Sequence, residues 1–413
     1  MENQKFQNTL YTNDNLFILT GLNSNLVDLI YLDPPFNSKR FYSAPVGSRA
    51  AGSSFKDMWT WQDVNEKYLE TLAGKYPALT DFIAAAGVMH SKAMAAYLTY
   101  MAQRIVEMHR VLKDTGSIYL HCDPTASHYL KGLLDEIFGK NNFRNEIVWC
   151  YRGGGSPKKD FGRRHDVILR YSKSDNYTFI ADDIRIPYQA EGLGRTDDAM
   201  WGKHKGTNKI YNPNPIGKVP EDWWLMNILN ANDPERTGYP TQKPLALLHR
   251  IIKASSNEGD IVMDPFCGCA TTCVAAQQLG RRWIGIDIAE QAREILIERL
   301  SDDAGLFKDF INTEIIPQRT DVQIVSEDDK SVKERLYKEQ NGCCNGCGKY
   351  FDIWNLETDH IIPQIKGGGS YYENYQLLCG TCNRIKGARP MEYLREKIAT
   401  RKKMLKEKII FGE

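Results

Sequence analysis

The sequence predicts an α/β fold, in which a mostly parallel sheet is flanked by helices, and a small metal-bound domain at the C-terminal end. Two candidate buried strands each end in an acidic motif, Asp33-Pro34-Pro35-Phe36 and Asp264-Pro265-Phe266. Helix-type and strand-type patterns alternate between these motifs, which is typical of α/β domains. Two Cys-x-x-Cys pairs then lie near the end of the chain, a spacing that favours a bound metal.

The first acidic motif follows residues 27–31, which predict a buried strand because they are short, mostly apolar and rich in β-branched or aromatic side chains. Pro34 and Pro35 end this strand, since proline fixes φ and lacks a backbone donor. The Asp33 carboxylate and the Phe36 ring are therefore expected at the C-terminal edge of a sheet, where open α/β sheets bind ligands. Taken alone, a simple turn after a strand is an equally good interpretation.

The chemistry suited to this first motif is attack by an exocyclic amine. The lone pair of such an amine is delocalised into its ring, and acceptance of its N–H groups by Asp33 and the Pro34 carbonyl would localise that pair on nitrogen. If the amine belongs to a nucleic-acid base such as adenine, Phe36 would stack on that base once it had left the double helix.

The second motif follows a predicted strand at residues 260–263 and opens a helix from Thr272 to Leu279. Another strand, at residues 283–286, then ends in Asp287. This order is typical of one half of a nucleotide-cofactor site: a strand, a turn of small residues, a helix, and a second strand that ends in an acidic residue. The acidic residue in such a site suits hydrogen bonds to ribose hydroxyls.

With its motifs in this order, the chain resembles the β class of DNA amino-methyltransferases that use S-adenosylmethionine (SAM), over residues 8–300. The resemblance implies the SAM-dependent methyltransferase fold and a double-stranded DNA substrate. It also implies that the catalytic residues are Asp33, Pro34, Pro35 and Phe36. The implied cofactor-binding residues are Asp14, Thr241, Gln242, Lys243, Asp264, Phe266, Gly268, Thr271, Thr272 and Asp287.

Three points of this resemblance leave alternatives open. Asp14 suits either a cofactor contact or the N-cap of a helix that begins at Asn15. The chain has Cys269 and Ala270 where the family often has Ser and usually has Gly, which predicts slightly tighter packing around the methionine moiety. An Asp before Pro-Pro favours N6 of adenine over N4 of cytosine, while methylation of RNA is a third alternative.

Between the two motifs the patterns predict two helices, at 93–112 and 128–138, and two strands, at 117–121 and 145–149. His121, Asp123 and His128 are grouped like metal ligands, but we expect structural or DNA-facing roles because the family has similar residues here without a metal.

Residues 151–220 hold 13 Lys and Arg against 8 Asp and Glu, a local excess of +5. Basic side chains for phosphates, interleaved with glycines and aromatics, favour DNA contact over a merely solvated loop. In the order of the family, the target-recognition region is expected at about residues 151–235.

Residues 301–330 are polar and predict a connector from the first domain, at 1–300, to a second domain at 331–390. In this second domain, Cys344, Cys347, Cys379 and Cys382 form two Cys-x-x-Cys pairs. Such pairs indicate a structural zinc with four thiolate ligands, and the metal would stabilise a segment too small for a large core. Cys343 falls outside this spacing.

Between and after the cysteine pairs stand Asp359-His360, Asn374 and Asn383, which resemble the three signature elements of a zinc-containing HNH endonuclease with its ββα-metal fold. The resemblance implies that His360 is the general base and that Asn374 orients it. Asp359 and Asn383 would hold one Mg²⁺ or Mn²⁺. A zinc module that only targets DNA is the alternative. Residues 391–413 predict a basic C-terminal helix.

The composition of the 413 residues is consistent with an enzyme of the cytoplasm. The formal net charge is +1, no apolar run approaches membrane length, and the first residues do not resemble a signal peptide. Ten cysteines without a secreted framework indicate a reduced compartment. A restriction–modification role is implied by the resemblance, and a homodimer remains an open alternative.

Overall fold

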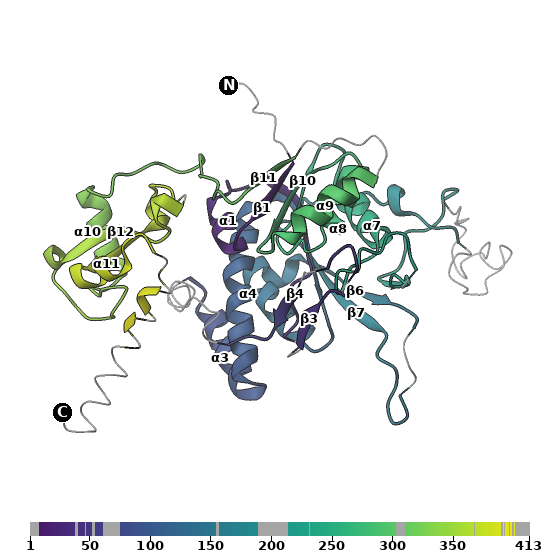
Figure 1. Ribbon diagram of the computed structural model, residues 1–413, viewed down its shortest axis with the longest axis horizontal. Helices are drawn as coiled ribbons and strands as arrows, with labels where there is room; N and C mark the ends of the chain where they lie inside the picture. Colours follow the sequence, from purple (N-terminus) through teal and green to yellow (C-terminus); the bar gives the residue numbers. More distant parts are fainter. Residues whose placement is uncertain are drawn as a thin grey trace, which may run out of the picture. The chain divides into compact units, whose positions relative to one another are not determined.

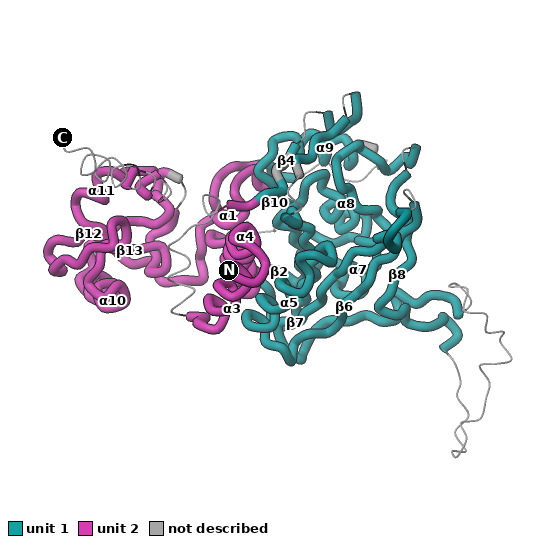
Figure 2. The backbone as a smooth tube through the Cα atoms, turned by 90° about the horizontal axis from the view of Figure 1, so that it is seen from below, with its two compact units in different colours: residues 1–10, 27–58, 112–312 teal, residues 11–26, 59–111, 313–413 magenta. Residues whose placement is uncertain are grey.

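The computed structural model describes most of the chain (Figure 1). The described residues are 8–37, 40–45, 47–51, 54–60, 75–153, 157–188, 214–230, 232–302, 310–366, 368–389, 391, 393–395, 397–398 and 400. The chain forms two compact units, coloured separately in Figure 2. Unit 1 comprises residues 1–10, 27–58 and 112–312, and unit 2 comprises residues 11–26, 59–111 and 313–413.

The largest sheet has nine strands in the order β11-β1-β10-β9-β2-β5-β7-β6-β8. Strands β10, β9, β2 and β5 run parallel, β7 is antiparallel to β5 and to β6, and β8 is parallel to β6. The predicted α/β class with a mostly parallel sheet is confirmed. The strands are β1 (Thr9–Thr12), β2 (Val27–Leu32), β5 (Leu112–Cys122), β6 (Phe143–Cys150), β7 (His165–Ser172), β8 (Trp223–Leu225), β9 (Ile261–Asp264), β10 (Arg282–Asp287) and β11 (Ile311–Thr313).

Strand β2 lies inside this sheet, and all six of its residues are buried. Its one charged residue, Asp28, accepts hydrogen bonds from Lys113 Nζ at 2.8 Å and from the backbone nitrogen of Ile261 at 2.9 Å. A buried carboxylate is tolerated when it is paired and hydrogen-bonded in this way. Asp28 therefore joins β2 to both of its neighbours in the sheet.

Helices pack on the strands of unit 1. Helices α7 and α8 contact each other, α8 contacts β9 and β10, and α9 contacts α8. Their buried side chains share a core with Tyr31, Trp149 and Trp283. The helices of the two units are α1 (Asn15–Gly21), α3 (Pro77–Met89), α4 (Lys92–Val111), α5 (Ser127–Leu134), α7 (Leu245–Ser255), α8 (Thr271–Gln278), α9 (Gln291–Asp302), α10 (Lys330–Glu339) and α11 (Gly380–Lys386).

The predicted helix at 128–138 differs from the structure at its end. Helix α5 stops at Leu134, and a π turn, Asp135–Gly139, follows it. Gly139 has φ of 86°, a conformation that suits glycine and terminates the helical backbone. A separate two-stranded sheet pairs β3 (Arg40–Ser43) with β4 (Ser54–Asp57).

The C-terminal part of unit 2 contains the antiparallel strands β12 (Leu356–His360) and β13 (Tyr375–Cys379), with α10 and α11 against β13. Its core is small and includes Leu336, Leu377 and Leu378. The expected connector at 301–330 includes strand β11 and a segment bound to α1 and its flanks. In that segment Thr320 N donates to Asn23 Oδ1 at 2.7 Å. The expected basic helix at 391–413 lies largely outside the described residues.

Among the helices described, none combines the length and the apolar character that crossing a membrane requires.

Candidate active sites

Asp33 follows β2 at the sheet edge where β9 and β10 end in Asp264 and Asp287. Its Oδ2 accepts a hydrogen bond from Lys243 Nζ at 2.5 Å, and the same ammonium donates to the Thr241 carbonyl at 3.2 Å. Its Oδ1 is buried and has no hydrogen-bond partner among the described residues. An acceptor left bare in this way is costly unless a ligand supplies the missing donor. Lys243 therefore orients the carboxylate, and one oxygen remains for an N–H group.

The rest of the first motif is held from both sides. The Phe36 ring stacks on His121, with centroids 6.2 Å apart and an interplanar angle of 20°. Lys243 Nζ lies 5.7 Å from the centre of the Phe36 ring. At the end of the motif, Asn37 adopts a left-handed φ of 63°, and its backbone nitrogen donates to Asp57 Oδ1 at 2.5 Å. The motif is thus a fixed turn and not a loose one.

A buried polar network supports this turn. The hydroxyl of Tyr31 lies 2.9 Å from His121 Nδ1, and His121 Nε2 lies 3.2 Å from Asp166 Oδ2. Tyr151 donates from its hydroxyl to Asp166 Oδ1 at 3.2 Å. His121 is fully buried, which fits the expected structural role. Buried networks whose members are all satisfied make a site rigid.

The ionisation of this network follows from its contacts. Burial alone would raise the pKa of Asp166, but the hydrogen bond and charge of His121 hold that pKa below its usual value. Burial and the charge of Asp166 raise the pKa of Tyr151 to about 12, so its hydroxyl stays a donor. The sequence did not reveal Asp166, because nothing local marks the first residues of β7.

The second motif forms the loop between β9 and α8. Asp264 accepts from the Thr272 hydroxyl at 2.5 Å and from the Phe266 backbone nitrogen at 3.0 Å. Asp287, at the end of β10, accepts from the Gly268 backbone nitrogen at 2.8 Å. Burial raises the pKa of Asp264 to about 7. The structure therefore brings these predicted cofactor residues together around one loop.

Two glycine-like conformations shape this loop. Gly268 has φ of 50°, and a Cβ there would lie 3.0 Å from the Tyr239 ring. Ala270 has φ of 57°, which explains why glycine is the ordinary residue at this place and which strains alanine mildly. Arg299 donates from Nη1 to the Cys269 carbonyl at 2.7 Å and to the Thr271 hydroxyl at 2.9 Å. Thr271 is thus engaged by helix α9.

Two other predicted cofactor residues have structural partners. Gln242 accepts from the backbone nitrogen of Thr237 and donates to the Glu235 carbonyl, each at 2.8 Å, so it folds its own loop. Asp14, in unit 2, is the N-cap of α1, and its Oδ1 accepts from Arg104 at 2.8 Å. The N-cap alternative for Asp14 is confirmed.

The four predicted zinc ligands gather in the C-terminal part of unit 2. The sulfur atoms of Cys344, Cys347, Cys379 and Cys382 all lie within 4.8 Å of one another. The backbone nitrogen of Cys379 points to Cys344 Sγ at 3.1 Å, a contact that stabilises a thiolate. Four clustered sulfurs are the donor set of a structural zinc site. Cys343 is not part of this group.

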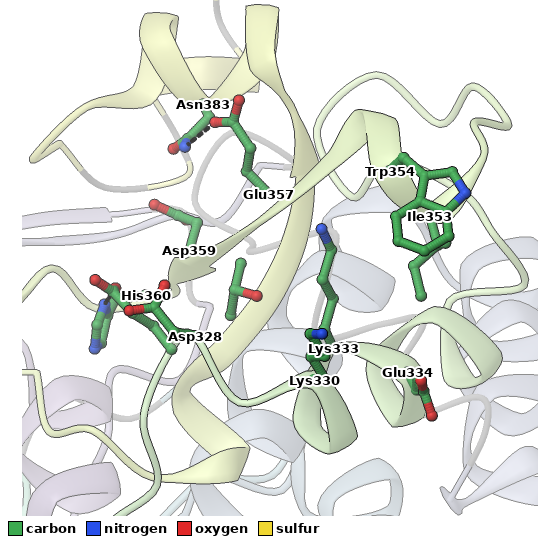
Figure 3. Close-up of a pocket in the computed structure, with 12 residues that line it drawn as sticks. Asp328, Lys330, Lys333, Glu334, Ile353, Trp354, Glu357, Asp359, His360 and Asn383 are labelled. Carbon is green, nitrogen blue, oxygen red and sulfur yellow. Dashed lines mark hydrogen bonds and ion pairs between the residues drawn. The ribbon is translucent and has the colours of Figure 1, made fainter.

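Three residues of the HNH resemblance, Asp359, His360 and Asn383, line one pocket of about 880 Å³ (Figure 3), whereas Asn374 is not among its lining residues. Its lining residues are Glu327, Asp328, Lys330, Lys333, Glu334, Ile353, Trp354, Glu357, Thr358, Asp359, His360 and Asn383. Asn383 donates from its amide nitrogen to Glu357 Oε2 at 2.6 Å, and this bond does not use the side-chain oxygen of Asn383. Carboxylate and amide oxygens in one pocket suit a hard divalent cation.

Asp359 is engaged more fully than Asp33. Gln376 donates to its Oδ2 at 2.6 Å, and Lys386 Nζ lies 3.1 Å from its Oδ1. Lys386 is 1% exposed, and its ammonium also donates to the His360 carbonyl at 2.8 Å. A divalent ion on Asp359 would share the carboxylate with this lysine.

The ring of His360 has polar side chains near both of its nitrogens, and the Tyr375 ring lies 4.7 Å from it between centroids. Its Nε2 lies 3.3 Å from the Ser370 hydroxyl, and its Nδ1 lies 3.5 Å from Glu327. Burial lowers the pKa of His360, against the opposing charges of Glu327 and Asp359, and so favours the neutral ring that a base needs. The sequence did not indicate Glu327, because it lies in the expected connector.

Asn374 differs from its expected role. Its side chain accepts from the backbone nitrogen of Ile362 at 2.9 Å and donates to the carbonyls of Ile362 and Gly369, at 3.1 and 2.8 Å. It therefore fixes the loop that follows His360, and Ser370 in that loop contacts the ring. Asn374 therefore acts on the orientation of His360 only through this loop and not by a direct hydrogen bond among the described contacts.

This fold and these sites define a class of protein: a group-transfer enzyme with a nucleotide-cofactor loop, joined to a small domain that contains four clustered cysteines. The chain belongs to the DNA methylase family of N6 and N4 amino-methyltransferases, whose model matches residues 27–298, and residues 344–389 match the HNH endonuclease model.

Known relatives are DNA-modifying enzymes. The chain is 26% identical over 318 residues to type II methyltransferase M.BglII of Bacillus subtilis, covering 75% of this chain and 74% of that one. It is 35% identical over 206 residues to DNA adenine methyltransferase YhdJ of Escherichia coli K12, covering 49% and 67%. Among solved structures, the cytosine-N4-specific PvuII DNA methyltransferase aligns with a TM-score of 0.44 at 14% identity, covering 71% and 86%.

Proposed function

We propose that this protein transfers a methyl group from SAM to N6 of adenine at specific sites in double-stranded DNA. The observation that carries the proposal is the buried, unpartnered Oδ1 of Asp33, whose other oxygen is held by Lys243. This arrangement supplies one oriented acceptor for an amine at the sheet edge where the cofactor loop lies. This acceptor suits adenine and cytosine amines alike, and the choice of adenine rests on the Asp that precedes Pro34-Pro35.

The residues of the chain would act on the base in the following way. Phe36 stacks on the extruded base, while Asp33 Oδ1 and the Pro34 carbonyl accept the two N–H groups of its amine. Acceptance localises the nitrogen lone pair, and the positioned acceptors stabilise the positive charge that develops on nitrogen. Pro35 keeps the turn rigid, and the network of His121 and Asp166 supports Phe36 from behind.

Bound SAM supplies an electrophilic methyl carbon on a sulfonium. Asp264, Gly268 and Asp287 are the residues best placed to hold it, because they form the closed loop between β9, α8 and β10. In this proposal Phe266, Thr271 and Thr272 shape that loop. Asp14, Thr241 and Gln242 remain proposed cofactor residues for which the structure shows other partners.

The modified base is tested by mass spectrometry of nucleosides from DNA incubated with protein and SAM. N6-methyl-2′-deoxyadenosine is the expected product. N4-methylcytosine would replace the adenine assignment by the cytosine alternative, and methyl transfer to RNA but not to duplex DNA would overturn the DNA substrate. Methylation-sensitive sequencing of the same DNA would map the site.

We further propose that the C-terminal domain cleaves or nicks DNA, with His360 as the base and Asp359 and Asn383 as ligands of Mg²⁺ or Mn²⁺. The shared pocket supports this assignment, and so does the burial that lowers the pKa of His360. One contact favours the alternative, a zinc module that only targets DNA. Lys386 Nζ donates to Asp359 Oδ1 and would compete with a divalent ion for that carboxylate. Nicking of unmethylated plasmid with Mg²⁺ is the test, and its absence across many sequences would favour the targeting module.

A methyltransferase and a nuclease on one chain fit restriction–modification, in which methylation protects the site from cleavage. We place the protein in the cytoplasm, with a zinc ion on Cys344, Cys347, Cys379 and Cys382. A homodimer is testable by sedimentation.

A further inference from the structure

The loop that joins β6 to β7 projects from the sheet of unit 1. The last paired residues of these strands are Cys150 and His165, and one further backbone hydrogen bond runs from Tyr151 N to Arg164 O at 3.0 Å. Beyond this point the chain extends away from the strands (Figure 1). We name the described residues of the loop, 151–153 and 157–164, the β6–β7 arm.

The β6–β7 arm carries a strong positive charge. Residues 151–164 include five basic residues and one acidic residue, Asp160. The exposed basic residues are Arg152, Lys158, Lys159 and Arg163. Cations concentrated on a projecting loop match the phosphates of a nucleic acid. The cores of protein interfaces are instead depleted of charge, so a protein partner fits this arm less well.

One large apolar side chain stands among these cations. The Phe161 side chain is 98% exposed, so it contributes almost nothing to the packing of its own unit. Proteins that bend or open a duplex insert apolar side chains between base steps, and bases stack readily on aromatic rings. A single ring flanked by cations has the chemistry of such an insertion.

The base of the β6–β7 arm lies beside the motif proposed to hold the target base. Tyr151 contacts Asp166 at 3.2 Å, Asp166 contacts His121 at 3.2 Å, and His121 is stacked by Phe36. At about 3.3 Å per residue, the arm reaches roughly 20 Å at most beyond its strands. That length allows its tip to enter the duplex from which an extruded base comes.

We propose that Phe161 enters the base stack of double-stranded DNA next to the target nucleotide and favours its extrusion, while the cations of the β6–β7 arm bind the flanking phosphates. This inference rests on the proposed function, because only a base that must leave the helix requires such a wedge.

Phe161→Ala tests the wedge on duplex oligonucleotides that carry the mapped site. On a fully paired duplex, the variant should lose about ten- to a hundredfold in methylation rate, and Phe161→Trp should keep most of the rate. When the target base faces a mismatch, the deficit should shrink to less than about threefold, since an unpaired base is extruded at lower cost. Val88→Ala, on an 89% exposed residue of α3, is the matched control and should leave both rates unchanged.

Two results would overturn the wedge: an unchanged rate of Phe161→Ala on the paired duplex, or an equal loss on the paired and mismatched duplexes. A second measurement does not depend on methyl transfer. Wild type should raise the fluorescence of 2-aminopurine placed at the target position, and Phe161→Ala should not. An inactive wild type that still raises the fluorescence would sink the proposed function alone. An active wild type with an indistinguishable variant would sink the wedge alone.

Discussion

The two candidate active sites of this chain place a lysine on a carboxylate in contrasting ways. At the methyl-transfer site, Lys243 holds one oxygen of Asp33 and leaves the other buried without a described partner. At the HNH site, Lys386 and Gln376 engage both oxygens of Asp359. The first carboxylate is therefore prepared for an incoming N–H donor, whereas both oxygens of the second already accept hydrogen bonds. Direct metal binding by Asp359 would compete with its lysine.

The supports of the two sites differ as well. Asp33 stands at the end of a strand inside a nine-stranded sheet with a large apolar core. Asp359 belongs to a two-stranded sheet with a small core beside four clustered cysteines. Two-stranded sheets are marginally stable alone. We therefore expect the first site to depend on packing and the second on a metal held by the four cysteines.

The largest effect is expected from Asp33→Ala. Methyl transfer should fall at least about a hundredfold, because the oriented acceptor for the amine is removed. SAM affinity, measured by calorimetry, should change little, since the cofactor loop is left intact. An equal loss of SAM affinity would show that Asp33 serves the cofactor and not the target base.

Cys344→Ser should unfold the small domain and leave methylation unaffected. Three thiolates hold zinc less tightly than four, and the domain has little core without it. Limited proteolysis should then release a methylation-competent fragment that ends near residue 330. Cys343→Ser, outside the cluster, is the matched control and should preserve the domain. Metal analysis that finds no zinc in intact protein would refute this side of the comparison.

Lys243→Met should sharpen the assignment of Lys243, which the sequence placed with the cofactor. Loss of a charged hydrogen bond to Asp33 should lower kcat by about ten- to a hundredfold. The KM for SAM should rise less than about threefold if the lysine acts mainly through Asp33. A rise in KM with kcat unchanged would return Lys243 to the cofactor site.

The smallest effect is expected from the pH dependence of Asp264. Burial raises its pKa to about 7 in the folded protein, above the usual value of about 3.9 for an unfolded chain. The folded state binds the extra proton, so the stability of ligand-free protein should fall as pH rises from about 4 to about 7. SAM carries an ammonium, so its affinity should rise by a few fold as Asp264 ionises.

Asp264→Asn should flatten the pH dependence of SAM affinity, measured by calorimetry at several pH values. A dependence that persists in this variant would mean that another group titrates.

The sequence predicted those parts of the sites that depend on neighbouring residues in the chain. Pro34 and Pro35 end a strand wherever it lies, and two Cys-x-x-Cys pairs give their ligands by spacing. The pair of Asp33 and Lys243 joins residues 210 positions apart, and Asp166 reaches His121 only because β7 pairs with β5. No local pattern encodes such contacts. Asn374 shows the same limit, since its role depends on the loop that folds over it.

One chain is expected to carry two separable active sites, one acting through Asp33 and one through His360. The most direct test measures methyl transfer and plasmid nicking side by side, with SAM and Mg²⁺ or Mn²⁺, for wild type, Asp33→Ala and His360→Ala. Asp33→Ala should lose only methyl transfer, and His360→Ala should lose only nicking, because His360 lies outside the zinc cluster. Equal nicking by wild type and His360→Ala, or loss of both activities in either variant, would contradict the account.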